Sequence, residues 1–333
     1  MSDPRITRSS RIDRRSAWRL VNAIGPVFGL ALVIGLFSLN PTVRETFFTG
    51  TNCKIILLQT VIVAIGALGM TMIIVSGGID LSVGSVVALA GVVGATSLVR
   101  GLGPGAAIAL TIAVAGVIGL INGLIIAVFR MMPFIVTLGM MGIARGTAKW
   151  LAGNQTVNAP RSPINSLMDM LDPLHFFPLP LGVWITIALA VLMAVMMQRT
   201  IFGRYIFAIG SNEATARLCG IRVGPMKVAI YGLAGLFFGL AGLMQMSRLA
   251  VGDPTVAIGL ELDIIAAVVI GGASLNGGTG SIWGSILGAL MMAVLRSGSN
   301  QMNWPNYIQE IIIGIVIILA VGLDKFRQGK AAA

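Results

Sequence analysis

The stretch GMTMIIVSGGIDLSVGS, residues 69–85, ends one apolar run at Gly77 and Gly78 and places the carboxylate of Asp80 just before a second apolar run. The two runs have the length and composition of membrane-spanning helices. A carboxylate that faces lipid at the centre of such a span costs about 2.5–3.5 kcal/mol on insertion scales. The stretch therefore indicates two membrane helices joined by a tight hairpin or re-entrant bend, in which Asp80 is shielded from lipid.

The composition of the whole chain agrees with a membrane protein. Of the 333 residues, 56% are hydrophobic and 11% are charged, whereas a soluble domain is about 25% charged. Apolar runs follow one another and leave too little polar sequence for a separate soluble domain. We expect an all-α polytopic membrane protein with about ten transmembrane helices, near residues 20–39, 53–76, 82–99, 105–129, 132–151, 181–197, 227–247, 261–275, 281–296 and 306–323.

The basic residues predict how these helices are oriented. The net charge is +11, but no basic patch contains the interleaved aromatic residues that would favour nucleic acid. Basic clusters beside spans are typical of the cytoplasmic side, and an even number of spans then places both termini there. The clusters are Arg5, Arg8, Arg11, Arg14, Arg15 and Arg19 before the first span, Arg199, Arg204, Arg217, Arg222 and Lys227 in one loop, and Lys325, Arg327 and Lys330 in the tail.

These features divide the chain into three parts. We expect a basic cytoplasmic amino-terminal segment (1–19), a transmembrane domain (20–323) and a cytoplasmic tail (324–333). The longest outer loop, 152–180, contains Ser162 and Pro163 in the order that begins a short helix. This loop is interpreted as an ordered lid or docking surface, with a solvated linker as the alternative.

A second glycine-rich stretch, IGGASLNGGTGSIWGSILG at 270–288, is similar to the first. Both place a Gly-Gly pair at the end of one apolar run and a Gly-Ser step early in the next, and the span count makes the two hairpins parallel. Interrupted spans in two halves of a chain often mark a transport pathway, although small residues also allow helices to pack closely. The hairpin residues are Gly77, Gly78, Asp80, Ser82, Gly84, Gly271, Gly272 and Asn276.

The acidic residues near helix starts have two interpretations. Asp80 can cap a helix that begins at Ser82, because its carboxylate accepts free N–H groups at the positive end of the helix dipole. It can alternatively form a proton or cation site, although no intramembrane base is placed to pair with it. Glu261 and Asp263 open the span 261–275 and suit the same end of a helix dipole.

Polar residues within the spans are candidates for a solute pathway. Their side chains can hydrogen-bond a polyhydroxylated solute or tie neighbouring helices together, and the sequence does not separate these roles. The candidates are Gln59, Asn122, Thr137 and Gln245.

The residues present argue against an enzyme. The one histidine of the chain, His175, lies in the outer loop, which excludes paired-histidine zinc motifs and a serine–histidine intramembrane hydrolase. No G-x-x-x-x-G-K-[ST] motif occurs, so any nucleotide must be bound by another subunit. We expect no catalytic residue, metal or cofactor in this chain. Cys53 and Cys219 are expected on opposite sides of the membrane.

The basic loop 198–226 is predicted to carry one short helix. Ser211 or Asn212 can cap it, and Gly220 follows Leu218 as a stop signal. A short helix held between two spans can fit a cleft in a partner protein, whereas the alternative is a solvated connector.

Three segments together resemble the permease subunits of bacterial monosaccharide ABC importers of the ribose type. They are GMTMIIVSGGIDLSVGS, FGRYIFAIGSNEATARLCGI (202–221) and ELDIIAAVVIGGASLNGGTG (261–280), and the resemblance covers most of residues 55–323. It implies a type II ABC importer permease-like fold in the bacterial plasma (inner) membrane and a chain that is not an enzyme. The implied partners are a second permease copy or paralogue, a cytoplasmic ABC ATPase that holds Mg-ATP, and a periplasmic or lipid-anchored sugar-binding protein.

The resemblance also implies roles for the short helix and for the chain. It implies ATP-driven import of a monosaccharide (a ribose-like pentose, hexose or polyol) by alternating access. The alternatives are an importer of branched-chain amino acids or another small solute, and an ion-coupled secondary carrier in which Asp80 is the coupling site. By this resemblance, the helix that couples the permease to the ATPase contains Ser211, Asn212, Glu213, Ala214, Arg217, Leu218, Gly220 and Ile221.

Overall fold

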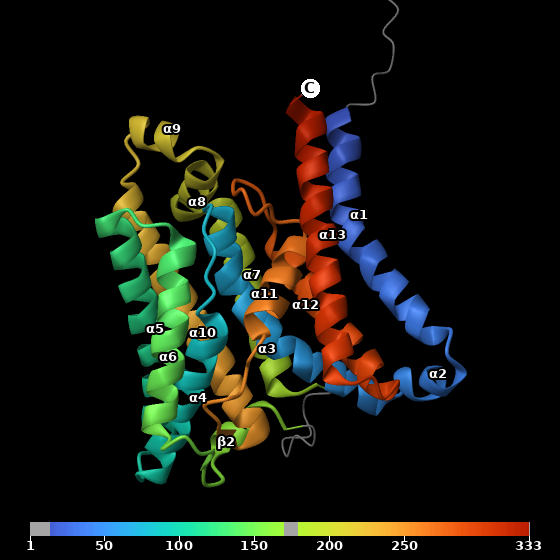
Figure 1. The fold of residues 1–333 in the computed structure, drawn as a ribbon, viewed down its shortest axis with the longest axis vertical. Helices are drawn as coiled ribbons and strands as arrows, with labels where there is room; N and C mark the ends of the chain where they lie inside the picture. Colours follow the sequence, from blue (N-terminus) through green and yellow to red (C-terminus); the bar gives the residue numbers. More distant parts are fainter. Residues whose placement is uncertain (1–13, 170–178, 333) are drawn as a thin grey trace, which may run out of the picture.

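The computed structural model describes residues 14–169 and 179–332, and these residues form an all-α bundle (Figure 1). One two-residue β pair and one short 3-10 helix accompany the α-helices of this part of the chain. His175 lies outside the described residues, as do Arg5, Arg8 and Arg11.

The helices follow the predicted spans closely. Most boundaries agree within a few residues because glycine, proline or a polar cluster interrupts the apolar sequence at each turn. The α-helices are α1 (Arg14–Ser38), α2 (Pro41–Phe47), α3 (Gly50–Val75), α4 (Val83–Val99), α5 (Pro104–Phe129), α6 (Pro133–Leu151), α7 (Leu181–Arg199), α8 (Ile201–Ser211), α9 (Glu213–Leu218), α10 (Val223–Leu249), α11 (Leu260–Ile270), α12 (Ile282–Gln301) and α13 (Asn306–Ala332).

Two of the predicted segments differ from the structure. The span expected at 261–275 is the 11-residue helix α11, whose length of about 16 Å is too short for a hydrocarbon core of about 30 Å. The loop 198–226 carries α8 as well as α9, because the segment from Ile201 to Ile209, apolar apart from Gly203, Arg204 and Tyr205, is long enough for a helix but too short for a span. Among the described residues, α3, α5, α7, α10 and α12 are each long and apolar enough to cross a membrane.

The bundle is packed around α3 and joined by glycine contacts. In the most apolar 18-residue stretch of α3, 94% of the residues are buried. Helix α10 lies against α5 so closely that a Cβ on Gly119 would be 2.2 Å from the carbonyl oxygen of Tyr231, and a Cβ on Gly235 would be 2.4 Å from that of Ala115. Small residues in membrane helices permit this backbone approach and the dispersion contacts that follow.

The two ends of the bundle differ in what they carry. Figure 1 shows α9, the start of α1 and the end of α13 at one end, which we call the α9 end, and α2 and β2 at the opposite end, which we call the β end. Cys53 lies near the start of α3 at the β end and Cys219 follows α9, and both are free thiols. This agrees with the prediction that the two cysteines lie on opposite sides.

Residues 152–169 of the outer loop are held to the end of α10. Strands β1 (Val157–Asn158) and β2 (Val251–Gly252) pair antiparallel. The predicted short helix is the 3-10 helix Pro163–Leu167, with Ser162 as its N-cap. The Ser247 hydroxyl of α10 donates to the Ile164 carbonyl at 2.7 Å, so the described part of this loop is not a free linker.

Candidate functional site

The connection between α3 and α4 turns back into the bundle. Gly77 has a φ of +84° where α3 ends, a conformation that glycine adopts without steric cost. Figure 1 shows the chain running from there, at the α9 end, toward the middle of the bundle before α4 begins. Asp80 is therefore enclosed by protein and is only 1% exposed, as its expected shielding from lipid requires.

Asp80 stabilises the turn that leads into α4. Its Oδ1 accepts the backbone N–H of Ser82 at 2.7 Å and the hydroxyl of the same residue at 2.6 Å. Helix α4 begins at Val83 with Ser82 as its N-cap. The expected hydrogen bond from the Ser82 N–H to Asp80 is present, but α4 begins one residue later than predicted, so the carboxylate bonds to the N-cap residue two positions ahead, as in an Asx turn.

Two of the predicted pathway residues lie beside this turn. Asn122 of α5 donates from Nδ2 to the Ser82 hydroxyl at 3.2 Å. The Thr137 hydroxyl of α6 accepts the N–H of Leu81 at 3.2 Å. Both residues are at most 1% exposed, so this geometry supports the alternative that they tie helices together.

The two glycine-rich hairpins meet at the end of α8. The N–H of Gly278 donates to the carbonyl of Val75 at 2.8 Å. Gly210 of α8 fits against both, since a Cβ there would lie 1.8 Å from the Val75 carbonyl oxygen and 2.6 Å from the Gly278 nitrogen. The hairpin 271–281 and the hairpin 76–82 therefore lie on the same side of the bundle, as the predicted parallel arrangement requires, and both contact the helix that precedes α9.

The remaining predicted hairpin residues are constrained by close backbone contacts. Gly271 and Gly284 face each other, and a Cβ on Gly284 would lie 1.9 Å from the Gly271 carbonyl oxygen. Gly272 has a φ of +92°, and the N–H of Asn276 donates to the Ser274 hydroxyl at 3.2 Å. A Cβ on Gly84 would lie 2.3 Å from the Glu261 carboxylate.

Helix α9 is short, but its own side chains and those of α10 hold it in place. Asn212 is its N-cap, with Oδ1 accepting the Thr215 N–H at 2.9 Å. Ala216 is buried against Ile209 and Val223, whereas Leu218 at the end of the helix is 89% exposed. The predicted cap, length and stop are present, with Asn212 rather than Ser211 as the cap and Gly220 at a φ of +83°.

Glu213 links α9 to the start of α10. Its carboxylate forms ion pairs with Arg217 at 2.6 Å and with Lys227 at 2.8 Å. Partial burial favours the protonated acid, but hydrogen bonds and attraction from the two cations outweigh it, so the pKa of Glu213 lies below its ordinary value. The carboxylate is therefore ionised at neutral pH and keeps both ion pairs.

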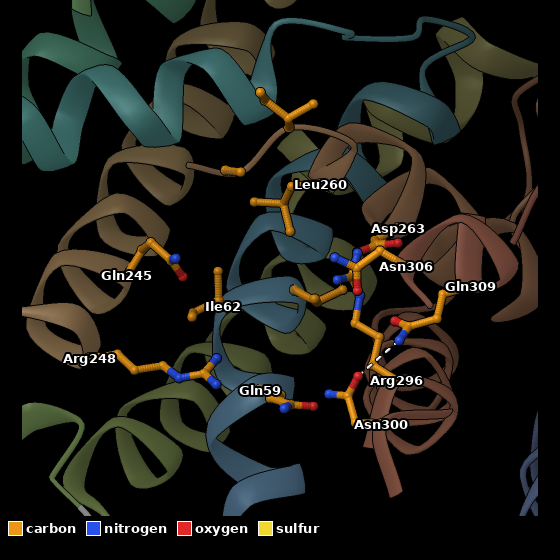
Figure 2. Close-up of a pocket in the computed structure, with 13 residues that line it drawn as sticks. Gln59, Ile62, Gln245, Arg248, Leu260, Asp263, Arg296, Asn300, Asn306 and Gln309 are labelled. Carbon is orange, nitrogen blue, oxygen red and sulfur yellow. Dashed lines mark hydrogen bonds and ion pairs between the residues drawn. The ribbon is translucent and has the colours of Figure 1, made fainter. Parts of the chain in front are cut away.

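A polar cavity of about 340 Å³ lies among α3, α10, α11, α12 and α13. Figure 2 shows Gln59 of α3 between Arg248 of α10 and Arg296 of α12, which enter from opposite sides. Eight of its thirteen lining residues are polar or charged, and the eight are Gln59, Gln245, Arg248, Asp263, Arg296, Asn300, Asn306 and Gln309.

The charges in the cavity are only partly paired. Arg296 forms an ion pair with Asp263 of α11. Asp263 is only 1% exposed. The second carboxylate oxygen of Asp263, Nε of Arg296 and Oε1 of Gln59 have no hydrogen-bond partner within the described chain. Arg248 likewise forms no ion pair with any described residue. Two arginines and one aspartate give the lining a formal charge of +1.

Two of the four predicted pathway residues lie in this cavity. Gln59 and Gln245 line it, whereas Asn122 and Thr137 do not. The sequence pattern places Asp263 only at the end of a helix dipole and does not single out Arg248, Arg296, Asn300, Asn306 or Gln309. The available signal was an arginine within one apolar run and an aspartate within another, because intramembrane charges usually face the bundle interior and pair with one another.

No metal centre competes with this cavity within residues 14–169 and 179–332. Those residues contain no group of three or more histidine, cysteine, aspartate or glutamate side chains close enough to hold a metal ion.

Comparisons with known proteins identify the relatives of the chain. A family model described as "Branched-chain amino acid transport system / permease component" matches residues 52–321. The chain is 40% identical over 299 residues to "Ribose import permease protein RbsC" of Escherichia coli (strain K12), which covers 90% of this chain and 93% of that protein. It is 40% identical over 317 residues to the protein of the same name from Bacillus subtilis (strain 168), covering 93% and 94% of the two chains.

A third relative carries the name of another pentose. "L-arabinose ABC transporter permease protein AraH" of Azospirillum brasilense is 33% identical over 328 residues, with 96% of this chain and 92% of the relative covered. No solved structure matches the chain.

Proposed function

Because the chain belongs to the family of branched-chain amino acid transport system permease components, we propose that it is the membrane subunit of an ATP-driven sugar importer. The names of its relatives support a monosaccharide as the solute, since they specify ribose and L-arabinose. Residues 20–323 form the permease domain, and the protein is located in the bacterial inner membrane with the α9 end in the cytoplasm. The substrate is a pentose, hexose or polyol.

The transport cycle requires partners that supply energy and solute. A second permease chain completes the pathway, a cytoplasmic ATPase holds Mg-ATP, and a periplasmic or lipid-anchored binding protein delivers the sugar. The loop 152–180, whose residues 157 and 158 pair with β2 at the β end, serves as the outer docking surface. ATP binding in the ATPase changes the side to which the pathway between the permeases opens.

The observation that carries this proposal is the construction of α9. Asn212 caps the helix, and Glu213 and Ala216 fix it to its neighbours, while Leu218 remains 89% exposed at the α9 end. An exposed apolar side chain on a rigid support is suited to insertion into a pocket of a partner, where it would be desolvated. We assign α9 as the helix that docks into the ATPase.

The movement of α9 has a direct route into the bundle. Its cap residue Asn212 follows α8 immediately, and Gly210 of α8 contacts both glycine-rich hairpins. A displacement of α8 must therefore move the backbone near Val75 and Gly278, because these contacts leave no space for sliding. This arrangement supports coupling between ATPase closure and the helices that line the cavity.

The proposal is tested with the purified permease, its ATPase and its binding protein in proteoliposomes. Leu218→Ala should lower ATP-driven uptake of the sugar about tenfold and weaken capture of the ATPase. Leu39→Ala is the matched control, because Leu39 is 80% exposed but follows α1 at the β end, and it should leave ATPase binding unchanged. Equal uptake and ATPase binding by Leu218→Ala and wild type would contradict the assignment of α9.

A further inference from the structure

The cavity among α3, α10, α11, α12 and α13 has the chemistry of a solute site. We propose that it binds one neutral monosaccharide during transport, through the unpaired polar atoms of Gln59, Asp263 and Arg296 and the guanidinium of Arg248. This inference rests on the proposed function and extends it, since it specifies where within one permease chain the sugar is held and what chemical class is accepted.

The unpaired atoms define what the ligand must offer. Gln59 Oε1 and Asp263 Oδ1 are acceptors, and Arg296 Nε is a donor, yet none has a partner within the described chain. Buried polar atoms are nearly always hydrogen-bonded, so three such atoms in one cavity wall indicate a partner that is supplied from outside the chain. A hydroxyl group both donates and accepts, and several hydroxyls on one small ring can therefore satisfy all three atoms.

The ion pair explains why a neutral ligand fits better than a charged one. The carboxylate of Asp263 already has its counter-ion in Arg296, so a ligand cation is not needed for neutralisation. A ligand anion could pair with Arg248, but it would bring a second negative charge into a cavity that already contains the buried carboxylate of Asp263, where like charges repel more strongly than in water. Vicinal hydroxyls can bridge the ion pair without separating its charges.

The size and wall of the cavity agree with a monosaccharide. Its volume of about 340 Å³ is at the lower end of the roughly 300–1,000 Å³ of small-molecule pockets. Each of the three unpaired atoms has less than 1 Å² of exposed surface, so the cavity wall must open slightly before the ligand can reach them. Such a site binds the sugar weakly until the wall moves, which suits a solute that is bound only briefly during transport.

Direct binding is tested by protection of a cysteine in the assembled importer. Gln245→Cys is introduced with Cys53→Ser and Cys219→Ser, and labelling by a polar maleimide is timed with and without solute. D-Ribose or L-arabinose at tens of millimolar should slow labelling at least threefold. Protection by leucine or by a sugar carboxylate, without protection by the neutral sugars, would overturn the assigned ligand class, and no protection by any of them would overturn the site.

Transport measurements then separate this site from coupling by α9. Gln59→Leu and Arg248→Met should each lower sugar uptake per ATP hydrolysed about tenfold, because each variant loses a hydrogen bond to a charged or buried partner. ATP hydrolysis stimulated by the binding protein should stay within about twofold of wild type. Thr60→Val is the control, since the Thr60 hydroxyl bonds to Ile56 of its own helix at 2.8 Å and is outside the cavity lining. It should transport normally.

The outcomes are distinct for the two proposals. Wild-type uptake per ATP by both cavity variants would overturn the solute site and leave the importer intact. A wild-type complex that hydrolyses ATP but takes up no monosaccharide would contradict the proposed function, whereas protection of the cysteine by sugar would still support the site.

Discussion

Gly278 donates its backbone N–H to the carbonyl of Val75 at 2.8 Å and so joins the two glycine-rich hairpins. The two residues are far apart in sequence, and Gly210 of α8 closes over the bond between them. The hydrogen bond and the glycine contact make one junction between the hairpins and the segment that carries α9. We expect this junction to be sensitive to the addition of a single methyl group.

Gly210→Ala should destabilise the junction. The new Cβ would lie 1.8 Å from the Val75 carbonyl oxygen, and the backbone must shift to make space, at a cost of about 1–3 kcal/mol for an overpacked site. We expect a lower melting temperature in detergent and reduced sugar uptake. Gly142→Ala is the control because a Cβ on Gly142 would have no other atom within 4 Å, and equal melting temperatures for the two variants would refute the close packing at Gly210.

Glu213 should hold α9 to α10 down to acidic pH. Its pKa is below its ordinary value because Arg217 and Lys227 stabilise the ionised form against the effect of partial burial. A group whose pKa is lowered on folding stabilises the fold above its ordinary pKa, and this contribution is lost as the pH falls through the lowered value. Hydrogen exchange of residues 213–218, corrected for intrinsic rates, should thus increase only at a pH below the ordinary range for glutamate.

The variant Glu213→Gln provides the comparison for this measurement. It cannot form either ion pair, so its α9 should exchange faster than wild type at neutral pH and should lack the acidic transition. A wild-type α9 that loosens at the ordinary pKa of glutamate would show that Arg217 and Lys227 do not stabilise the carboxylate.

Asp80 should tolerate asparagine better than alanine. Asparagine retains an oxygen that accepts the Ser82 N–H, whereas alanine leaves that buried group without a partner at a cost of about 1–3 kcal/mol. We expect Asp80→Asn to assemble and keep much of its transport, and Asp80→Ala to assemble poorly, as judged by size-exclusion chromatography and uptake. Abolished transport by a well-assembled Asp80→Asn variant would favour a role for the charge itself.

The two members of the cavity ion pair should respond unequally to removal. Arg296→Met leaves the carboxylate of Asp263 buried without its counter-ion, and breaking a buried pair in this way costs about 3–5 kcal/mol. Asp263→Leu leaves Arg296, whose side chain is 39% exposed and can turn to solvent, so it should cost less. Thermal unfolding should also show the double variant to be more stable than Arg296→Met, and the reverse order would contradict the burial of Asp263.

Local sequence patterns were sufficient for most elements of the fold. Each span is marked by an apolar run between glycine, proline or polar breaks, and this signal depends only on neighbouring residues. The same holds for α9, where Asn212 begins the helix and Gly220 ends it. Two local predictions were incomplete: α8 forms within the basic loop, and α11 stops at Gly271 because the glycine pair interrupts the run before a full span is built.

The sequence indicated only some of the residues that line the cavity, because local patterns do not show which helices pack together. Gln59 and Gln245 stood out as polar residues within apolar runs, and so did Asn122 and Thr137. Nothing local separates these pairs, because each side chain can hydrogen-bond a solute or another helix. Their roles diverge when α5 and α6 bring Asn122 and Thr137 to the Asp80 turn, while α3 and α10 bring the two glutamines to the cavity.

Hydrophobic runs, caps and turns are set by adjacent residues, so the order of amino acids was enough to establish a multi-helix membrane chain with two glycine-rich hairpins and a short capped helix. The pairing of Asp263 with Arg296, and the closure of Gly210 over the bond between Val75 and Gly278, emerged only from the folded bundle. These contacts join residues from helices that are distant in the chain. Their formation depends on how closely glycine and other small residues allow the backbones to approach, which no single segment encodes.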